Sequence, residues 1–142
     1  KTAYEISTRD WSSDVCSSDL TEREARIELR NEVDGPAVIA SDLLNYLECR
    51  NVILKLGSDG ILIESRLNKE LKDEPQRIES LNLNPIDISG AGDSLLACAT
   101  LSLAQGKSLK EASLLGSITA AIQISREGNL PIKKNELMDL LN

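Results

Sequence analysis

Apolar residues recur at helical spacing in the two segments that precede residue 50. In "TEREARIELRNE", Thr21 and Glu24 have the spacing of a capping box, which predicts a short helix that begins near Thr21. In "DGPAVIASDLLNYLECR", Pro36 suits a first helical position. The apolar residues of this second predicted helix recur on one face, and they are Val38, Ile39, Leu43, Leu44 and Leu47.

Two short runs of aliphatic residues follow these helices. They predict strands over residues 52–56 and 61–64, joined by the turn "GSDG". A helix followed by apolar strands is typical of an α/β domain. Residues 65–83 are charged and irregular, and we expect exposed strands or loops at a sheet edge there.

The C-terminal third of the chain reads as helical. Residues 94–106 contain no charged side chain, which predicts a helix that is buried on most sides and ends at Gly106. Ser108 and Glu111 have capping-box spacing and predict the start of the next helix. "KKNELMDLL" predicts a last short helix. The apolar residues that the second of these helices is expected to bury are Leu114, Leu115, Ile118, Ala121 and Ile122.

The charge and the cysteine count exclude several classes of function. The formal net charge is −7 over 142 residues, which argues against a nucleic-acid-binding protein, and no apolar run is long enough to cross a membrane. The three cysteines lack C-x-x-C spacing, and without histidine neither a zinc site nor a histidine-based triad can form. We therefore expect a single domain in a reducing, cytoplasmic compartment.

Residues 1–20 do not share the periodicity of the rest. They repeat the triplet Ser-Ser-Asp at 12–14 and 17–19 and have no helix or strand pattern. They resemble translated sequencing-adapter read-through, and a disordered native tail is the alternative. We expect the folded part to be residues 21–142.

The segment "DISGAGDS" at residues 87–94 is the strongest candidate for chemistry. If Gly90, Ala91 and Gly92 form the turn that enters the next helix, their amides and the positive helix end create a phosphate cradle. Asp93 beside it would be an ionised carboxylate that can accept the proton of an attacking hydroxyl. The alternative is a glycine-rich turn with an ordinary helix cap. A dinucleotide fingerprint is excluded because Leu95 stands where its third glycine belongs.

These residues resemble the C-terminal part of the ribokinase/PfkB family of carbohydrate kinases. "DISGAGDS" is similar to the family signature D-[TS]-[TS]-G-A-G-D-[ST], "LGSDG" to its T-L-G-x-x-G element, and "TEREA" to its N-x-x-E element. "SITAAIQISREGNLPI" is similar to the helix and R-x-G-A segment that follow. The resemblance covers residues 21–142 and implies a ribokinase-like three-layer α/β/α fold. The surroundings of the signature resemble the heptose-7-phosphate kinase branch.

The resemblance implies transfer of a phosphate from ATP, with Mg²⁺, to a hydroxyl of a sugar or sugar phosphate. Asp93 would be the catalytic base, and the amides of Gly90, Ala91 and Gly92 the anion hole. Glu24 would help to organise Mg²⁺ through water, and its other interpretation is the capping box.

Further contacts are implied for the nucleotide and for a monovalent cation. The residues near ATP would be Lys55, Gly57, Ser58, Gly60 and Ser117. Asp87 and Ser89 would contribute to a K⁺ site, together with backbone at residues 123–128. Four positions depart from the family pattern: Thr21 replaces the asparagine of N-x-x-E, Lys55 a threonine, Ser117 an asparagine that is common there, and Asn129 the alanine of R-x-G-A.

The sugar-binding residues of the family lie upstream of the resembling segment, so the segment alone is expected to be inactive. A homodimer is the expectation for a full-length parent protein. Three alternatives remain open: a non-catalytic nucleotide-binding relative, a nucleoside kinase of the same fold, or a small α/β domain with a glycine-rich cap and no ligand.

Overall fold

The structure is a computed structural model that describes residues 20–66, 74–82 and 84–141. The chain forms two compact units. The first unit is Lys1–Leu56 with Ile61–Arg77, and the second unit is Gly57–Gly60 with Ile78–Asn142. The tail predicted at residues 1–20 lies outside the described residues, apart from Leu20.

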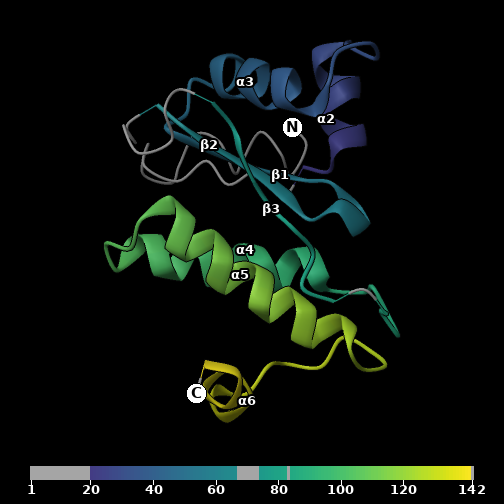
Figure 1. The fold of residues 1–142 in the computed structure, drawn as a ribbon, viewed down its shortest axis with the longest axis vertical. Helices are drawn as coiled ribbons and strands as arrows, with labels where there is room; N and C mark the ends of the chain where they lie inside the picture. Colours follow the sequence, from purple (N-terminus) through teal and green to yellow (C-terminus); the bar gives the residue numbers. More distant parts are fainter. Residues whose placement is uncertain (1–19, 67–73, 83, 142) are drawn as a thin grey trace, which may run out of the picture. The chain divides into compact units, whose positions relative to one another are not determined.

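The first unit places two helices on one face of a strand pair (Figure 1). The helices are α2 (Glu22–Leu29) and α3 (Pro36–Tyr46), and the strands are β1 (Asn51–Lys55) and β2 (Ile61–Ser65). β1 and β2 pair antiparallel, with Lys55 opposite Ile61 across the turn. A short strand, β3 (Gln76–Ile78), follows in the order β1-β2-β3. The two strands agree with the prediction to within a residue and the turn lies at the predicted residues, while residues 67–73 and 83 of the predicted edge segment lie outside the described residues.

The core of the first unit lies between α3 and the strands. Ile39, Leu43 and Leu44 of α3 pack with Val52 and Leu54 of β1. Val38 was predicted to join them, but it is 46% exposed. The buried stripe of α3 runs through positions 39, 40, 43 and 44, so position 38 falls outside it at 3.6 residues per turn.

Both predicted capping boxes are confirmed. Glu24 Oε2 accepts from the Thr21 amide at 2.7 Å, and Glu111 Oε2 accepts from the Ser108 amide at 2.9 Å. In each box the hydroxyl of the first residue accepts from the glutamate amide in return. Thr21 thereby begins α2, and Ser108 begins α5 (Leu109–Ile124).

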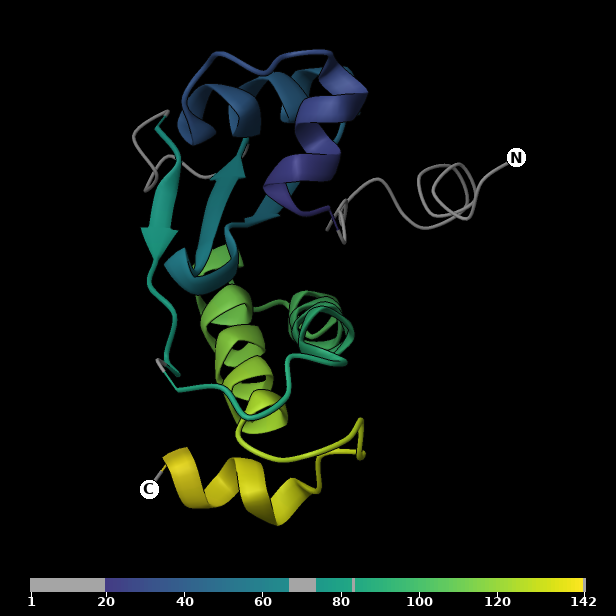
Figure 2. The ribbon, with the colours of Figure 1, turned by 90° about the vertical axis from the view of Figure 1, so that its right-hand side faces the viewer.

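The second unit is built on α4 (Ala91–Ala104) and α5, which pack against each other; Figure 2 shows α4 nearly end-on beside α5. A β-carbon at Gly116 of α5 would lie 2.8 Å from the Leu95 carbonyl oxygen of α4, so only glycine permits this approach. A one-turn helix, η1 (Gly57–Asp59), and a last helix, α6 (Lys134–Leu141), complete the unit. In the described part of the chain, no helix is long and apolar enough to cross a membrane.

The predicted burial of α4 and α5 is wrong in two respects. Leu114 is 45% exposed, and the other large residues expected inside are only half-buried. Close contact between the helices selects small side chains, so the face of α5 that is buried holds Leu109, Ala112, Ser113, Gly116, Ser117, Thr119 and Gln123. On α4, likewise, one side is buried, through Leu95, Ala99 and Ser102, while Leu101 is 64% exposed.

Candidate functional site

The glycine-rich segment forms the N-terminus of α4. Gly90 is the N-cap in the left-handed region, with φ +76°, and no side chain caps the helix. The helix begins at Ala91 and not at Ser94, so Ala91 and Gly92 belong to the first turn and not to the turn before it. Their amides lie at the positive end of the helix, where an anion finds donors and a favourable dipole.

Asp93 lies in this first turn and is solvent-exposed. Among the residues that the structure describes, its carboxylate has no hydrogen bond and no ion pair. The interpretation of Asp93 as an ordinary cap therefore has no hydrogen bond to support it. An exposed carboxylate without a protein partner can accept a proton from a bound hydroxyl.

The loop that leads into α4 is tied to the loop that follows α5. Asp87 Oδ1 accepts from the Ser89 amide at 2.9 Å, and its Oδ2 accepts from the Gly128 amide at 3.0 Å. The Ser89 side chain lowers the pKa of Asp87 most, and the amides of Ser89 and Gly128 lower it further from its ordinary value of 3.8. The amide of Ile86 donates to the Ile124 carbonyl at 2.7 Å. Asp87 and Ser89 are thus linked by hydrogen bonding, and their role toward a cation stays a prediction.

Gln123 makes a second link between the same loops, and the sequence did not reveal it. Its side chain is 1% exposed, and Nε2 donates to the Gly128 carbonyl at 3.0 Å and to the Ser89 carbonyl at 3.4 Å. The one available signal is a long amide on the face of α5 that otherwise buries mostly small residues.

Asn129 packs against Gly90. A β-carbon at Gly90 would meet the side-chain amide of Asn129, which can move aside, so it is the positive backbone angle that favours glycine there. Asn129 is the position that departs from the family's alanine. The N-terminus of α4 therefore has a polar side chain against its first glycine.

Glu24 and Lys55 belong to the first unit, and the remaining predicted site residues belong to the second. Thr21 forms a parallel bridge with Lys55, and this bridge brings the start of α2 to the end of β1. Hydrogen bonds from the amide and then the hydroxyl of Thr21 lower the pKa of Glu24, and the charge of Lys55 adds a smaller effect. The capping interpretation of Glu24 is confirmed, and its role toward Mg²⁺ stays a prediction.

The predicted nucleotide residues of the second unit divide into two places. Gly57 and Ser58 form η1 with Asp59. Gly60 has φ +88° and lies directly against the backbone of residues 78–80. Ser117 is on α5 and is buried.

A pocket of about 330 Å³ that the sequence did not reveal lies beside this loop. Asn82 Nδ2 donates to the Ala121 carbonyl at 3.3 Å, so residues 78–82 run from Gly60 to α5. The residues of α5 in the pocket follow helical spacing and form one mostly apolar stripe. The full lining is Leu81, Asn82, Ile118, Ala121, Ile122 and Ser125.

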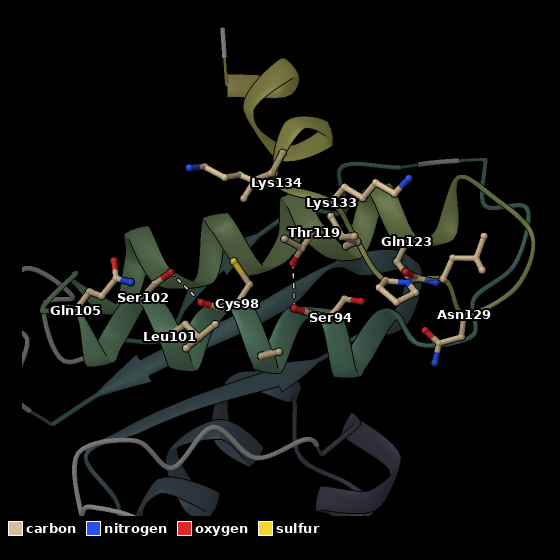
Figure 3. A pocket seen from close by; sticks show the side chains of 15 residues that line it. Ser94, Cys98, Leu101, Ser102, Gln105, Thr119, Gln123, Asn129, Lys133 and Lys134 are labelled. Atoms are coloured by element: carbon tan, nitrogen blue, oxygen red, sulfur yellow. Dashed lines mark hydrogen bonds between the residues drawn. The ribbon is translucent and has the colours of Figure 1, made fainter.

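A second pocket, of about 360 Å³, lies along α4 and α5 beneath residues 129–134 (Figure 3). Thr119 Oγ1 donates to the Ser94 carbonyl at 3.0 Å and joins the two helices within it. Gln123 and Asn129 lie at the end of the pocket near the start of α4. Cys98 also lines this pocket, and neither it nor Cys49 is in a disulfide.

Within residues 20–66, 74–82 and 84–141, no three acidic, cysteine or histidine side chains cluster as a metal site. Mg²⁺ in phosphate-transfer enzymes is held through one or two carboxylates together with substrate phosphates.

Comparison with known families identifies the chain. A sequence model described as "pfkB family carbohydrate kinase" matches residues 20–134. This chain belongs to the pfkB family of carbohydrate kinases. The match includes the glycine-rich segment at the start of α4 and the capping box of α2.

Two curated pfkB relatives illustrate the extent of the match. The Bifunctional protein HldE of Desulfatibacillum aliphaticivorans is 32% identical over 98 residues, 69% of this chain and 19% of that protein. The Ribokinase of Schizosaccharomyces pombe is 30% identical over 113 residues, 75% of this chain and 34% of that protein. The chain therefore spans a fifth to a third of the length of these relatives.

Solved structures confirm the ribokinase-like α/β fold. The ribokinase of Thermotoga maritima matches with a TM-score of 0.70 and 24% identity, over 85% of this chain and 40% of that chain. Phosphofructokinase-2 of Escherichia coli in complex with potassium matches with a TM-score of 0.71 and 20% identity, over 84% of this chain and 38% of that chain.

The hydrogen bonds to Asp87 predict a defined pH dependence of stability. Because the folded-state pKa is lowered, the stabilisation is present above the unfolded-state pKa and is lost as the pH falls through the folded-state pKa. Asp87→Asn should therefore be less stable than the wild type at pH 7, and the difference should shrink below about pH 4. Urea unfolding of both proteins across this range measures the effect. A difference that stays constant with pH would show that the carboxylate charge has no part in it.

Proposed function

We propose that this pfkB-family chain carries the phosphate-binding and proton-accepting part of an ATP-dependent kinase for a sugar or sugar-phosphate hydroxyl. The observation that carries the proposal is the N-terminus of α4, which has no side-chain cap and holds the exposed Asp93 in its first turn. The likeness to the HldE proteins and to ribokinases supports a carbohydrate acceptor. A cytoplasmic location is part of the proposal.

In the proposed reaction the acceptor hydroxyl lies at the Asp93 carboxylate. Its oxygen attacks the γ-phosphorus, its proton passes to Asp93, and the bond from phosphorus to the leaving ADP oxygen breaks. The amides of Ala91 and Gly92, and that of Gly90 before them, donate to the phosphate oxygens as negative charge develops there. When bound, Mg²⁺ supplies further neutralisation of the phosphate charge. Glu24, ionised near neutral pH because its pKa is lowered, would orient water on the metal.

We place the nucleotide base in the pocket lined by Leu81, Ile118 and Ala121. The support is its position, since residues 78–82 connect it to Gly60 of the proposed phosphate and ribose loop. Its mostly apolar lining and its size also suit a flat ring. Ser117 lies one helical turn before Ala121, so this placement keeps it near the base.

Asp93→Asn tests the proton acceptor. In a protein of the full length of the relatives, kcat should fall by about 10²–10⁴ because the amide cannot accept the proton. The dissociation constant for Mg²⁺–ATP should change little, since the amides that hold the phosphates remain. Steady-state phosphorylation and calorimetry measure the two quantities.

Unchanged turnover in Asp93→Asn would remove Asp93 from the mechanism. Nucleotide binding without turnover in the wild type would instead favour the non-catalytic relative. If the wild type does not bind nucleotide, the remaining interpretation is an α/β domain with no ligand.

The two capping boxes provide a matched test of Glu24. Glu24→Gln and Glu111→Gln each keep an oxygen that can accept from the N-cap amide and remove the negative charge, so each should cost at most about 1 kcal/mol of stability. Only Glu24→Gln should weaken the Mg²⁺ dependence of nucleotide binding, because Glu111 has no proposed role toward the metal. Chemical unfolding and calorimetry at varied Mg²⁺ measure both. Equal effects of the two variants on Mg²⁺-dependent binding would reduce Glu24 to a cap.

A pair of identical substitutions tests the base pocket. Ala121→Leu should fill it and raise the dissociation constant for the nucleotide roughly 10-fold or more, as steric exclusion of part of the ring costs over 1.4 kcal/mol. Ala97→Leu makes the same change in the other pocket and should leave nucleotide affinity unaltered. Weaker binding in Ala97→Leu alone would move the base to the pocket along α4.

A further inference from the structure

The side chain of Gln123 lies between two carbonyl oxygens that belong to different loops. Ser89 precedes α4, and Gly128 follows α5. Both of these oxygens can only accept hydrogen bonds. The group that faces them is therefore the NH₂ group of Gln123, which donates to both. The Gln123 side chain is 1% exposed, whereas Ser89 and Gly128 are exposed residues, so a buried amide joins two surface loops.

A monovalent cation would also bind between these carbonyl oxygens. The resemblance to the family implies K⁺ at Asp87 and Ser89, with backbone oxygens of residues 123–128. In this chain both Asp87 oxygens already accept backbone amides, one from each loop. The Ser89 and Gly128 carbonyls already accept the Gln123 amide. A cation and an NH₂ group cannot both occupy the space between the same two oxygens, so the residues present do not fit the ion.

We infer that the Gln123 amide replaces the monovalent cation in this chain and holds the loop before α4, residues 87–90, in place without it. The two loops meet through donors and acceptors that the chain itself supplies: Gln123 to the carbonyls, and the Ser89 and Gly128 amides to Asp87. Gly90 follows directly on this joint. Gln123 is therefore a positioning residue that acts through the loop and does not touch the reacting atoms.

The inference rests on the proposed function only in one respect, namely that the loop binds phosphate. The joint itself is a property of the fold and can be measured without nucleotide or sugar. A failure of phosphorylation would leave the joint unaffected, and a failure of the joint would leave the assignment of Asp93 open to its own test.

The test compares thermal unfolding of the 142-residue chain in KCl, NaCl and choline chloride at equal ionic strength. The wild type should unfold at the same temperature in all three salts. Gln123→Ala removes the donor and leaves room for an ion. It should unfold several degrees lower in choline chloride, because the Ser89 and Gly128 carbonyls lose their donor, and should regain much of this loss in KCl.

Gln123→Met is the matched control, since it keeps the length of the side chain but cannot donate. It should be destabilised in all three salts and should not respond to K⁺, because the thioether still fills the space. A Gln123→Ala protein that K⁺ does not restore would overturn the inference, as would restoration of Gln123→Met by K⁺.

A measurement on the wild type alone covers the case in which a variant does not fold. In ¹⁵N-resolved spectra, the backbone amides of Ser89 and Gly128 and the side-chain amide of Gln123 should not shift as K⁺ replaces choline. Saturable shifts confined to these groups would mean that the wild type binds the ion and that Gln123 does not replace it.

Discussion

The approach of α5 to α4 at Gly116 determines where the chemistry of the second unit lies. With no β-carbon beneath the Leu95 carbonyl, α5 runs back along α4 so that its last turn reaches the loop before Gly90. The Ile86 amide then finds the Ile124 carbonyl, and Asp87 finds the Gly128 amide. A helix N-terminus attracts anions only if its amides point outward in a fixed direction. The contact between α5 and α4 at Gly116 therefore helps to fix the direction of the amides at the start of α4.

The N-terminus of α4 differs from those of α2 and α5 in one chemical respect. Thr21 and Ser108 satisfy the first amides of their helices from within the chain, whereas Gly90 has no side chain to do so. A capped terminus is stable by itself, and an uncapped one has donors available for a ligand. The start of α3 also follows a glycine and has no side-chain cap, but of the two uncapped starts only that of α4 has a carboxylate, Asp93, in its first turn.

Local signals in the sequence predicted the parts of the fold that depend on neighbouring residues. The capping boxes at Thr21 and Ser108, the proline at the start of α3 and the turn at residues 57–60 each involve only a few successive positions. The face of α5 was not predictable in this way, because that helix is apolar almost all round and only its partner decides which side is buried. Gln123 was missed for the same reason, since its two acceptors are 34 and 5 residues away along the chain.

The glutamine at the loop joint differs from an ion in how it is supplied. A side chain anchored to α5 is present at a constant and high effective concentration, set by its tether and not by the surrounding medium. An ion must be captured from solution, so the order of the loop would follow the ionic composition of the cell. With the donor covalently attached, the loop keeps its geometry across changes in salt. The concentration of the ion then cannot regulate the order of the loop.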